Sequence, residues 1–443
     1  MSLITAERFG SADWHRRVWR LALPIMAANV STPLLGAVDT AVVGHLPEPH
    51  YLGSVAVGAM VFSFLFWGFS FLRMGTTGPT AQALGRGDDD EVRAILGRAL
   101  ILAVVIGLAL IALREPLRWA ALAAFDASPA VEGEAAGYIA LRLWGAPATL
   151  GNYVLIGWLL GLQRPMWTLA LQIALNATNI ALDLLFVPVM GLGVPGVAIA
   201  SALAEWTAFA LGLFLAARVL KAHGGAWSRA RLLDRAAFRR LVALNADIMI
   251  RTLCLIGAFA VFTNQGARFG DRILAANAVL WQLQMFTSFA LDGFAHAAET
   301  LVGGTIGRRR RAELAQAVRA STVWAALVST GFVAAYLMAG PAIIDLLTGI
   351  PEVRATARTY LPWAAALPVL SVWSFQLDGI FLGATWSKAI RNAMLASVAI
   401  YLAALFLAVP AMDNHGLWLA LAIFMVARGA TLAAAYPALA RAV

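Results

Sequence analysis

Stretches of about twenty apolar residues recur along the whole chain, with short polar segments between them. A helix needs about 20 such residues to cross the hydrocarbon core of a bilayer. Of the 443 residues, 61% are hydrophobic and 13% are charged, whereas soluble domains average about 45–50% and about 25%. The pattern predicts an all-α polytopic membrane protein with about twelve transmembrane helices. These are expected near 16–43, 53–83, 92–113, 131–160, 165–189, 195–220, 236–265, 273–304, 312–346, 354–382, 387–410 and 415–440.

Basic residues gather in three of the polar segments. The net charge is +9, from 33 Lys and Arg against 24 Asp and Glu. The excess lies at the N-terminus, at 218–240 and at 308–311, which all fall on one side if the helices alternate in direction. Because positively charged loops stay in the cytoplasm, both termini are predicted to be cytoplasmic. The excess fits membrane orientation and anionic lipid, and no nucleic-acid partner is expected.

The two halves of the sequence resemble each other at a constant spacing. Tyr138 and Tyr360 are 222 residues apart, as are GWLLG at 157–161 and GIFLG at 379–383. A repeat of six spans returns the chain to the side it started from, so the two copies form a parallel repeat. The sequence therefore predicts two pseudo-symmetric six-helix lobes. The expected domains are 1–217 for the N-lobe, 218–240 for a basic cytoplasmic linker and 241–443 for the C-lobe.

The first apolar stretch contains one acid, Asp39, and has Pro24 near its start. A carboxylate inside a membrane helix costs about 2.5–3.5 kcal/mol on insertion scales, so it is a functional-site hypothesis by default. Proline removes a backbone hydrogen bond and can kink a helix. An acid on a bendable helix suits a transporter whose shape responds to protonation.

The fifth expected span carries Asn176, Asn179 and Asp183 at i, i+3 and i+7, which is one face of a helix. Burial disfavours the ionised carboxylate and amide donors favour it, so this face suits a group that gains and loses a proton. The alternative is that these polar groups only hold helices together. Both interpretations stay open for Asn176, whereas a functional role is favoured for Asp183.

Other polar residues of the first half could share this pocket: Tyr138, Asn152 and Ser201. Tyr138 fits an interfacial aromatic equally well. Glu205 faces either the same cavity or the cytoplasmic end. Arg142 is a candidate to pair with a membrane acid that the sequence does not identify.

In the second half, Asp292, His296 and Glu299 form one polar stripe at i, i+4 and i+7. The stripe fits a proton relay or a packed network between helices, with the network slightly favoured. Asp378 in the tenth span is a further acid of either kind. No metal site is predicted, since Cys254 is the only cysteine and thiolate clusters are therefore excluded.

Six segments resemble the multidrug and toxic compound extrusion (MATE) family, and within it the DinF-like subfamily. They are AVDTAVVGHL at 37–46, YLGSVAVGAM at 51–60, GWLLGLQRP at 157–165, NATNIALDLLFV at 176–187, GVPGVAIASALAEW at 193–206 and LDGFAHAAETLVGG at 291–304. The resemblance covers nearly the whole chain. It implies two six-helix lobes around a central cavity that opens alternately to each side of a prokaryotic cytoplasmic membrane.

The resemblance also implies roles for individual residues. It places the coupling acids at Asp39 and Asp183, with Asn179 one turn before the second, and the helix bend at Pro24. Tyr138 and Ser201 match polar network positions of the family. Asp378 lies near an acid of the other bacterial subfamily, which leaves a Na+ site there open.

The resulting prediction is a monomeric secondary antiporter that exports amphipathic, cationic compounds in exchange for H+, favoured over Na+. No cofactor is expected apart from the coupling ion, and the only partners expected are small substrates and lipid. The alternatives are an exporter of citrate-like organic anions and a flippase for lipid-linked saccharides. A membrane-embedded enzyme is disfavoured, because the sequence lacks the GxxxxGK[ST], HExxH and GxSxG motifs.

Overall fold

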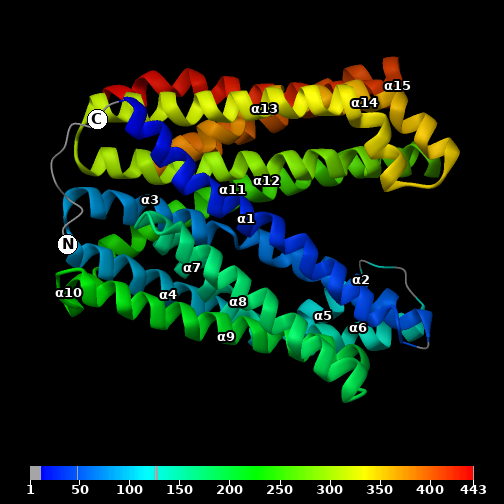
Figure 1. Ribbon diagram of the computed structural model, residues 1–443, viewed down its shortest axis with the longest axis horizontal. Coiled ribbons are helices and arrows are strands. Elements are labelled where there is room, and N and C mark those ends of the chain that lie inside the picture. Colours follow the sequence, from blue (N-terminus) through cyan, green and yellow to red (C-terminus); the bar gives the residue numbers. More distant parts are fainter. Residues whose placement is uncertain (1–10, 47, 124, 126–127, 443) are drawn as a thin grey trace. The chain divides into compact units, whose positions relative to one another are not determined.

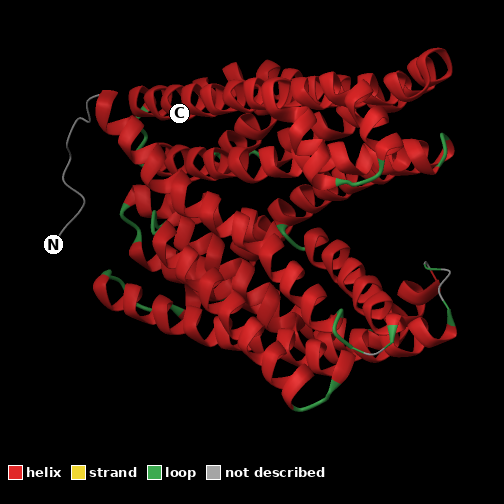
Figure 2. Ribbon diagram, turned by 45° about the vertical axis from the view of Figure 1, so that its right-hand side comes forward, coloured by secondary structure: helices red, strands yellow, loops and turns green. Residues whose placement is uncertain are grey.

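The computed structural model describes residues 11–46, 48–123, 125 and 128–442, and Figure 1 traces their order. Helices joined by short connections make up these residues, and no strand occurs among them (Figure 2). The helices are α1 (Ser11–Val43), α2 (Pro49–Gly68), α3 (Phe71–Arg86), α4 (Asp89–Ala112), α5 (Arg114–Ala123), α6 (Pro129–Arg142), η1 (Leu143–Gly145), α7 (Ala146–Gly161), α8 (Pro165–Leu184), η2 (Leu185–Val189), α9 (Gly193–Ala222), α10 (Arg229–Leu232), α11 (Arg235–Arg268), α12 (Asp271–Gly307), α13 (Arg311–Leu347), α14 (Pro351–Gly383) and α15 (Ser387–Arg441).

Each expected span falls on a helix or on a run of consecutive helices, which confirms the all-α membrane fold. Within the described residues, nine helical segments are long and apolar enough to cross a membrane. The other expected spans are α1, the interrupted run from α6 to α7, and the second part of α15. Two expected spans meet inside α15 at Asp413, whose φ of 49° breaks the helical backbone. The polar segment after α4, expected to be a loop, forms the short helix α5.

The parallel repeat is confirmed by the positions of helix ends. α6 and α14 begin at Pro129 and Pro351, which are 222 residues apart, and Gly161 and Gly383 end α7 and α14 at the same spacing. The backbone turns into the left-handed region at matching places in both halves. These pairs are Gly87 with Arg309, Gln163 with Thr385, and Gly191 with Asp413. The two halves therefore share their turns as well as their helices.

Glycine allows a close helix contact at the same place in each half. A Cβ on Gly157 of α7 would collide with the backbone oxygen of Arg73 in α3. A Cβ on Gly379 of α14 would collide in the same way with the backbone oxygen of Ala295 in α12. Small residues let membrane helices approach this closely, and packing is what holds them together in lipid.

Gly157→Ala and Gly379→Ala are each expected to destabilise the protein by about 1–3 kcal/mol, because the added methyl group forces two backbones apart. Thermal unfolding in detergent would measure the effect. Gly137→Ala and Gly331→Ala are matched controls, since a Cβ at either position meets nothing within 4 Å. Equal stability of all four variants would contradict the close-contact interpretation.

The described residues form two compact units, one of residues 27–249 and the other of residues before 27 together with 250–443. Each unit includes the first part of the helix that opens the other half of the sequence, namely α11 in the first unit and α1 in the second. The lobe limits 1–217 and 241–443 remain predictions, since they were placed at the linker and not by contacts.

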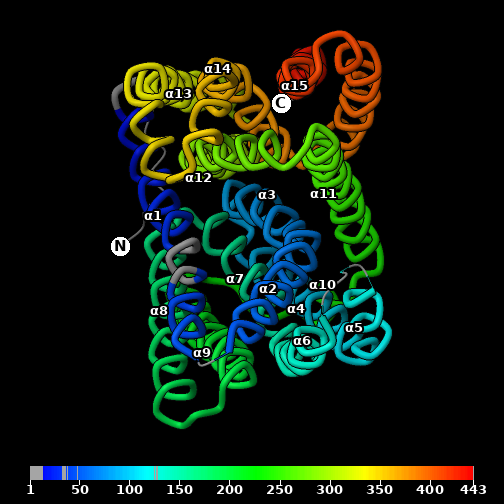
Figure 3. The backbone as a smooth tube through the Cα atoms, turned by 90° about the vertical axis from the view of Figure 1, so that its right-hand side faces the viewer, coloured from blue at the N-terminus to red at the C-terminus, as the bar shows by residue number. Residues whose placement is uncertain are grey.

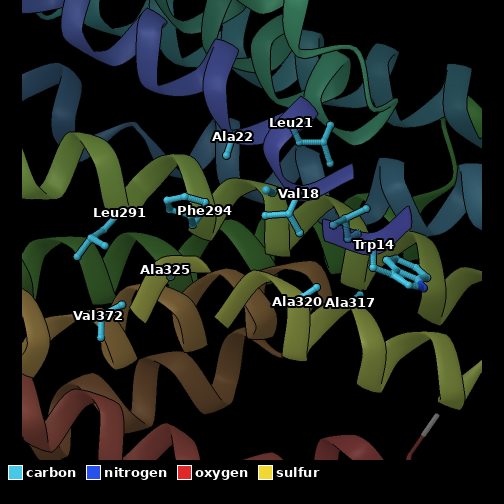
Figure 4. Packing of buried hydrophobic residues seen from close by; sticks show 12 residues of the cluster. Trp14, Val18, Leu21, Ala22, Leu291, Phe294, Ala317, Ala320, Ala325 and Val372 are labelled. Atoms are coloured by element: carbon cyan, nitrogen blue, oxygen red, sulfur yellow. The ribbon is translucent and has the colours of Figure 1, made fainter. Parts of the chain in front are cut away.

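The core of the second unit forms around the start of α1. Trp14 and Val18 of α1 are almost fully buried and pack with Leu291 and Phe294 of α12 (Figure 4). Small residues of α13, such as Ala317, complete the cluster. This packing includes the beginning of α1 in the same unit as the second half of the sequence.

The connection between α9 and α11 is bound to the beginning of α4 in the first unit. Arg93 of α4 donates hydrogen bonds to the backbone oxygens of Leu220 (2.6 Å) and Gly224 (3.0 Å), at the end of α9. Arg231 forms an ion pair with Asp88 at 2.6 Å. Guanidinium groups near a helix C-terminus satisfy carbonyls that have no partner within the helix. The predicted basic linker is therefore anchored to α4.

Candidate ion-coupling site

Two acids from different helices meet inside the first unit. Asp39 lies near the end of α1 and Asp183 near the end of α8, and their carboxyl groups hydrogen-bond to each other. Asp183 has no exposed surface. The Oδ1 atom of each acid has no donor among the described residues. Since a carboxylate cannot donate, a hydrogen bond between two carboxyl groups requires a proton on one of them.

The polar face of α8 holds α1 at a second point. Asn176 donates from Nδ2 to the backbone oxygen of Ser31 at 3.1 Å and accepts from Gln172 at 3.1 Å. One turn after Asn176, Asn179 donates from Nδ2 to the carboxylate of Asp183. The expected face of Asn176, Asn179 and Asp183 is thus turned inward as one set. Sequence reasoning did not include Gln172, although it lies four residues before Asn176 on the same face.

Tyr138 of α6 is buried beside this pair. Its hydroxyl hydrogen-bonds with Ser201 of α9, and its ring interacts electrostatically with Asp39 and Asp183. Only 2% of Tyr138 is exposed, which does not fit the alternative of an interfacial aromatic. The structure therefore brings Tyr138 and Ser201 to the acid pair, as the sequence predicted.

Asn152 of α7 contacts a third acid. Its Nδ2 atom donates to the Oε2 atom of Glu205 at 2.9 Å and to the backbone oxygen of the same residue at 3.0 Å. Glu205 lies on α9, which packs against α8 and α7 in this unit (Figure 3). Of the two placements left open for Glu205, the structure shows it inside the lobe and hydrogen-bonded.

Arg142, the last residue of α6, provides the positive charge of this region. Its guanidinium lies over the ring of Phe62, 5.4 Å from the ring centroid. It interacts electrostatically with Asp39, Asp183 and Glu205. The sequence identified Arg142 as a candidate partner of a membrane acid, and the structure shows which acids it faces.

In the second unit, Asp378 of α14 lies between two arginines. Arg251 of α11 donates to its Oδ2 atom, and Arg428 of α15 donates to the same atom at 2.7 Å. Asp292 of α12 interacts electrostatically with Arg428. Two protein cations therefore already neutralise the carboxylate of Asp378.

The remaining expected residues stay on single helices. Glu299 is fully buried on α12, and His296 is half-buried one turn before it. α1 passes Pro24 as one continuous helix, so a bend there remains a prediction.

The sequence profile of the MatE family matches this chain twice, over residues 24–185 and again over residues 248–408. The two matches correspond to the two copies of the structural repeat. The chain belongs to the MATE family. MATE proteins are multi-pass membrane transporters and not enzymes, so both predictions are confirmed.

Known MATE proteins resemble the chain over nearly its full length. DNA damage-inducible protein F of Escherichia coli K12 is 43% identical over 419 residues, which cover 95% of this chain and 91% of that protein. The probable multidrug resistance protein NorM of Neisseria meningitidis serogroup A is 26% identical over 79% of this chain and 77% of its own length. A crystal structure of MATE in the bent conformation shares the fold, with a TM-score of 0.87, 19% identity and 98% coverage of both chains. The DinF-like resemblance of this MATE protein is thereby confirmed.

Proposed function

We propose that this MATE protein is a secondary active multidrug efflux antiporter that exchanges H+ for amphipathic, cationic compounds by alternating access. The observation that supports this proposal is the hydrogen bond between the buried carboxyl groups of Asp39 and Asp183. Two acids in one desolvated site cannot both be ionised without a large repulsion, so the pair holds and releases a proton readily. The substrate class rests on the likeness to NorM and to the MATE family.

The donors around the pair favour a proton over Na+. Asn179 presents an N–H group to Asp183. A hard cation such as Na+ needs several oxygen ligands, and a donor in that place does not supply one. A proton needs only the two carboxyl groups themselves.

In this scheme, the deprotonated pair attracts a cationic substrate from the cytoplasm. A proton that enters from outside neutralises the pair, restores the hydrogen bond between α1 and α8, and weakens the hold on the substrate. One charge moving down ~100 mV yields about 2.3 kcal/mol, and the pH gradient adds to this. The protein acts as a monomer in the cytoplasmic membrane, with both termini on the cytoplasmic side because the basic loops face inward.

Asp378 has a structural role in this proposal. Its carboxylate is held by Arg251 and Arg428, so those side chains occupy the place that a coupling cation would take. The proton site therefore belongs to the first unit alone.

Purified protein in liposomes would test the proposal, with proton and sodium gradients imposed separately and efflux of a fluorescent organic cation followed. We expect a proton gradient alone to drive efflux and a sodium gradient alone to have no effect. Efflux driven only by sodium would contradict the coupling ion. Transport of citrate in place of the cation would identify an organic-anion exporter.

A further inference from the structure

Glu205 is an acid within the first unit that the exchange scheme above does not use. It is half-buried on α9 and held by two hydrogen bonds from Asn152, and its side chain also hydrogen-bonds with Thr149 of α7. An acid inside a membrane helix is costly unless it has a partner and a role. The amide and hydroxyl groups fix the position of the carboxylate but bring no charge to balance it.

The geometry of α6 and α9 brings a cation to this acid. Tyr138 and Arg142 are one turn apart on α6, and Ser201 and Glu205 are one turn apart on α9. The first pair of rungs is the hydrogen bond between Tyr138 and Ser201. The next pair of rungs, Arg142 and Glu205, is an electrostatic contact between opposite charges. The two helices pack against each other along this face.

Arg142 faces the acid pair as well. Its charge acts on Asp39 and Asp183, and the ring of Phe62 supports one face of the guanidinium. A guanidinium stacked on an aromatic ring can turn about its long side chain while it keeps that contact. Arg142 is thus within electrostatic reach of two separate carboxylate sites.

We propose that Arg142 is a positioning residue shared between the Asp39–Asp183 pair and Glu205, and that proton binding at the pair moves its guanidinium toward Glu205. This inference rests on the proposed proton site. The deprotonated pair carries more negative charge and draws Arg142 toward α1 and α8. Protonation removes part of that attraction, so the pull of Glu205 then prevails.

The movement would carry the protonation state to other helices. Glu205 is tied to α7 through Asn152, so a shift of Arg142 changes the force between α6 and the α7–α9 pair. The other titratable groups that face this region are Tyr138 on α6 and Tyr153 on α7, and Arg73 of α3 also acts on Tyr153. Both tyrosines stay neutral at physiological pH, which leaves Arg142 as the mobile charge between the two sites.

The pH of half-maximal cation efflux in liposomes tests the proposal. Arg142→Gln removes a cation that favours the ionised pair, so the half-maximal pH should rise by about one unit. Glu205→Gln leaves Arg142 entirely to the pair, so the half-maximal pH should fall. Glutamine still accepts from Asn152, so this variant should keep its fold. In the double variant the half-maximal pH should equal that of Arg142→Gln alone, because the effect of Glu205 acts through Arg142.

Arg118→Gln and Glu115→Gln are matched controls, since they remove the same charges from an ion pair on α5, whose side chains are 39% and 56% exposed. Neither control should move the half-maximal pH. An equal shift from Glu205→Gln with and without Arg142 would overturn the proposal, as would unchanged pH profiles in both single variants. The wild-type profile must also depend on Asp183. A profile that survives Asp183→Asn would instead refute the proton site itself.

Discussion

Asparagine in place of Asp183 is expected to reduce proton-driven efflux to the level of empty liposomes while the protein remains inserted in the membrane. The new amide can still hydrogen-bond with Asn179, but it cannot gain or lose a proton. The charge of the pair would then no longer follow pH, and the gradient could not drive export. Asp39→Asn should have the same effect, because its carboxyl group belongs to the same pair.

Asp345→Asn is the control for these two variants. Asp345 is an acid of α13 that is partly exposed and forms an ion pair with Arg358 at 2.7 Å. Its loss should leave efflux unchanged. Wild-type efflux in both Asp39→Asn and Asp183→Asn would remove the proposed site.

Asparagine in place of Asp378 is expected to lower stability by about 3–5 kcal/mol, the usual cost of removing one partner from a buried ion pair. The substitution leaves Arg251 and Arg428 buried without their shared carboxylate. A lower unfolding temperature and a lower yield in detergent would report the loss. The molecules that do fold should keep proton-driven efflux.

A second substitution makes the explanation specific. Arg251→Gln in the Asp378→Asn background removes one of the two uncompensated cations, so part of the stability should return. Wild-type stability of Asp378→Asn together with lost transport would show that Asp378 binds a coupling ion.

The sequence predicted the helices and their repeat well, because the bilayer fixes the length of a spanning helix. The spacing of 222 residues seen in Tyr138 and Tyr360 reappears in the first residues of α6 and α14. The interruptions within spans were not predicted. The η1 turn at Leu143–Gly145 divides a stretch whose apolar composition is continuous, so hydropathy carries no sign of the break.

The candidate site was predicted where helical periodicity could define it. The face of Asn176, Asn179 and Asp183 follows from spacing on one helix. Contacts between helices were harder to predict, because they depend on packing. Asn152 pairs with Glu205, which is 53 residues away. Asp378 pairs with arginines that are 127 and 50 residues away in sequence.

The central claim is that the Asp39–Asp183 pair exchanges its proton for the substrate. The most direct test is to add an organic cation to purified protein in weakly buffered detergent solution and to record proton release with a pH indicator. We expect release from the wild-type protein and none from the Asp39→Asn/Asp183→Asn double variant. Release from the double variant equal to that of the wild type would show that the proton is held elsewhere.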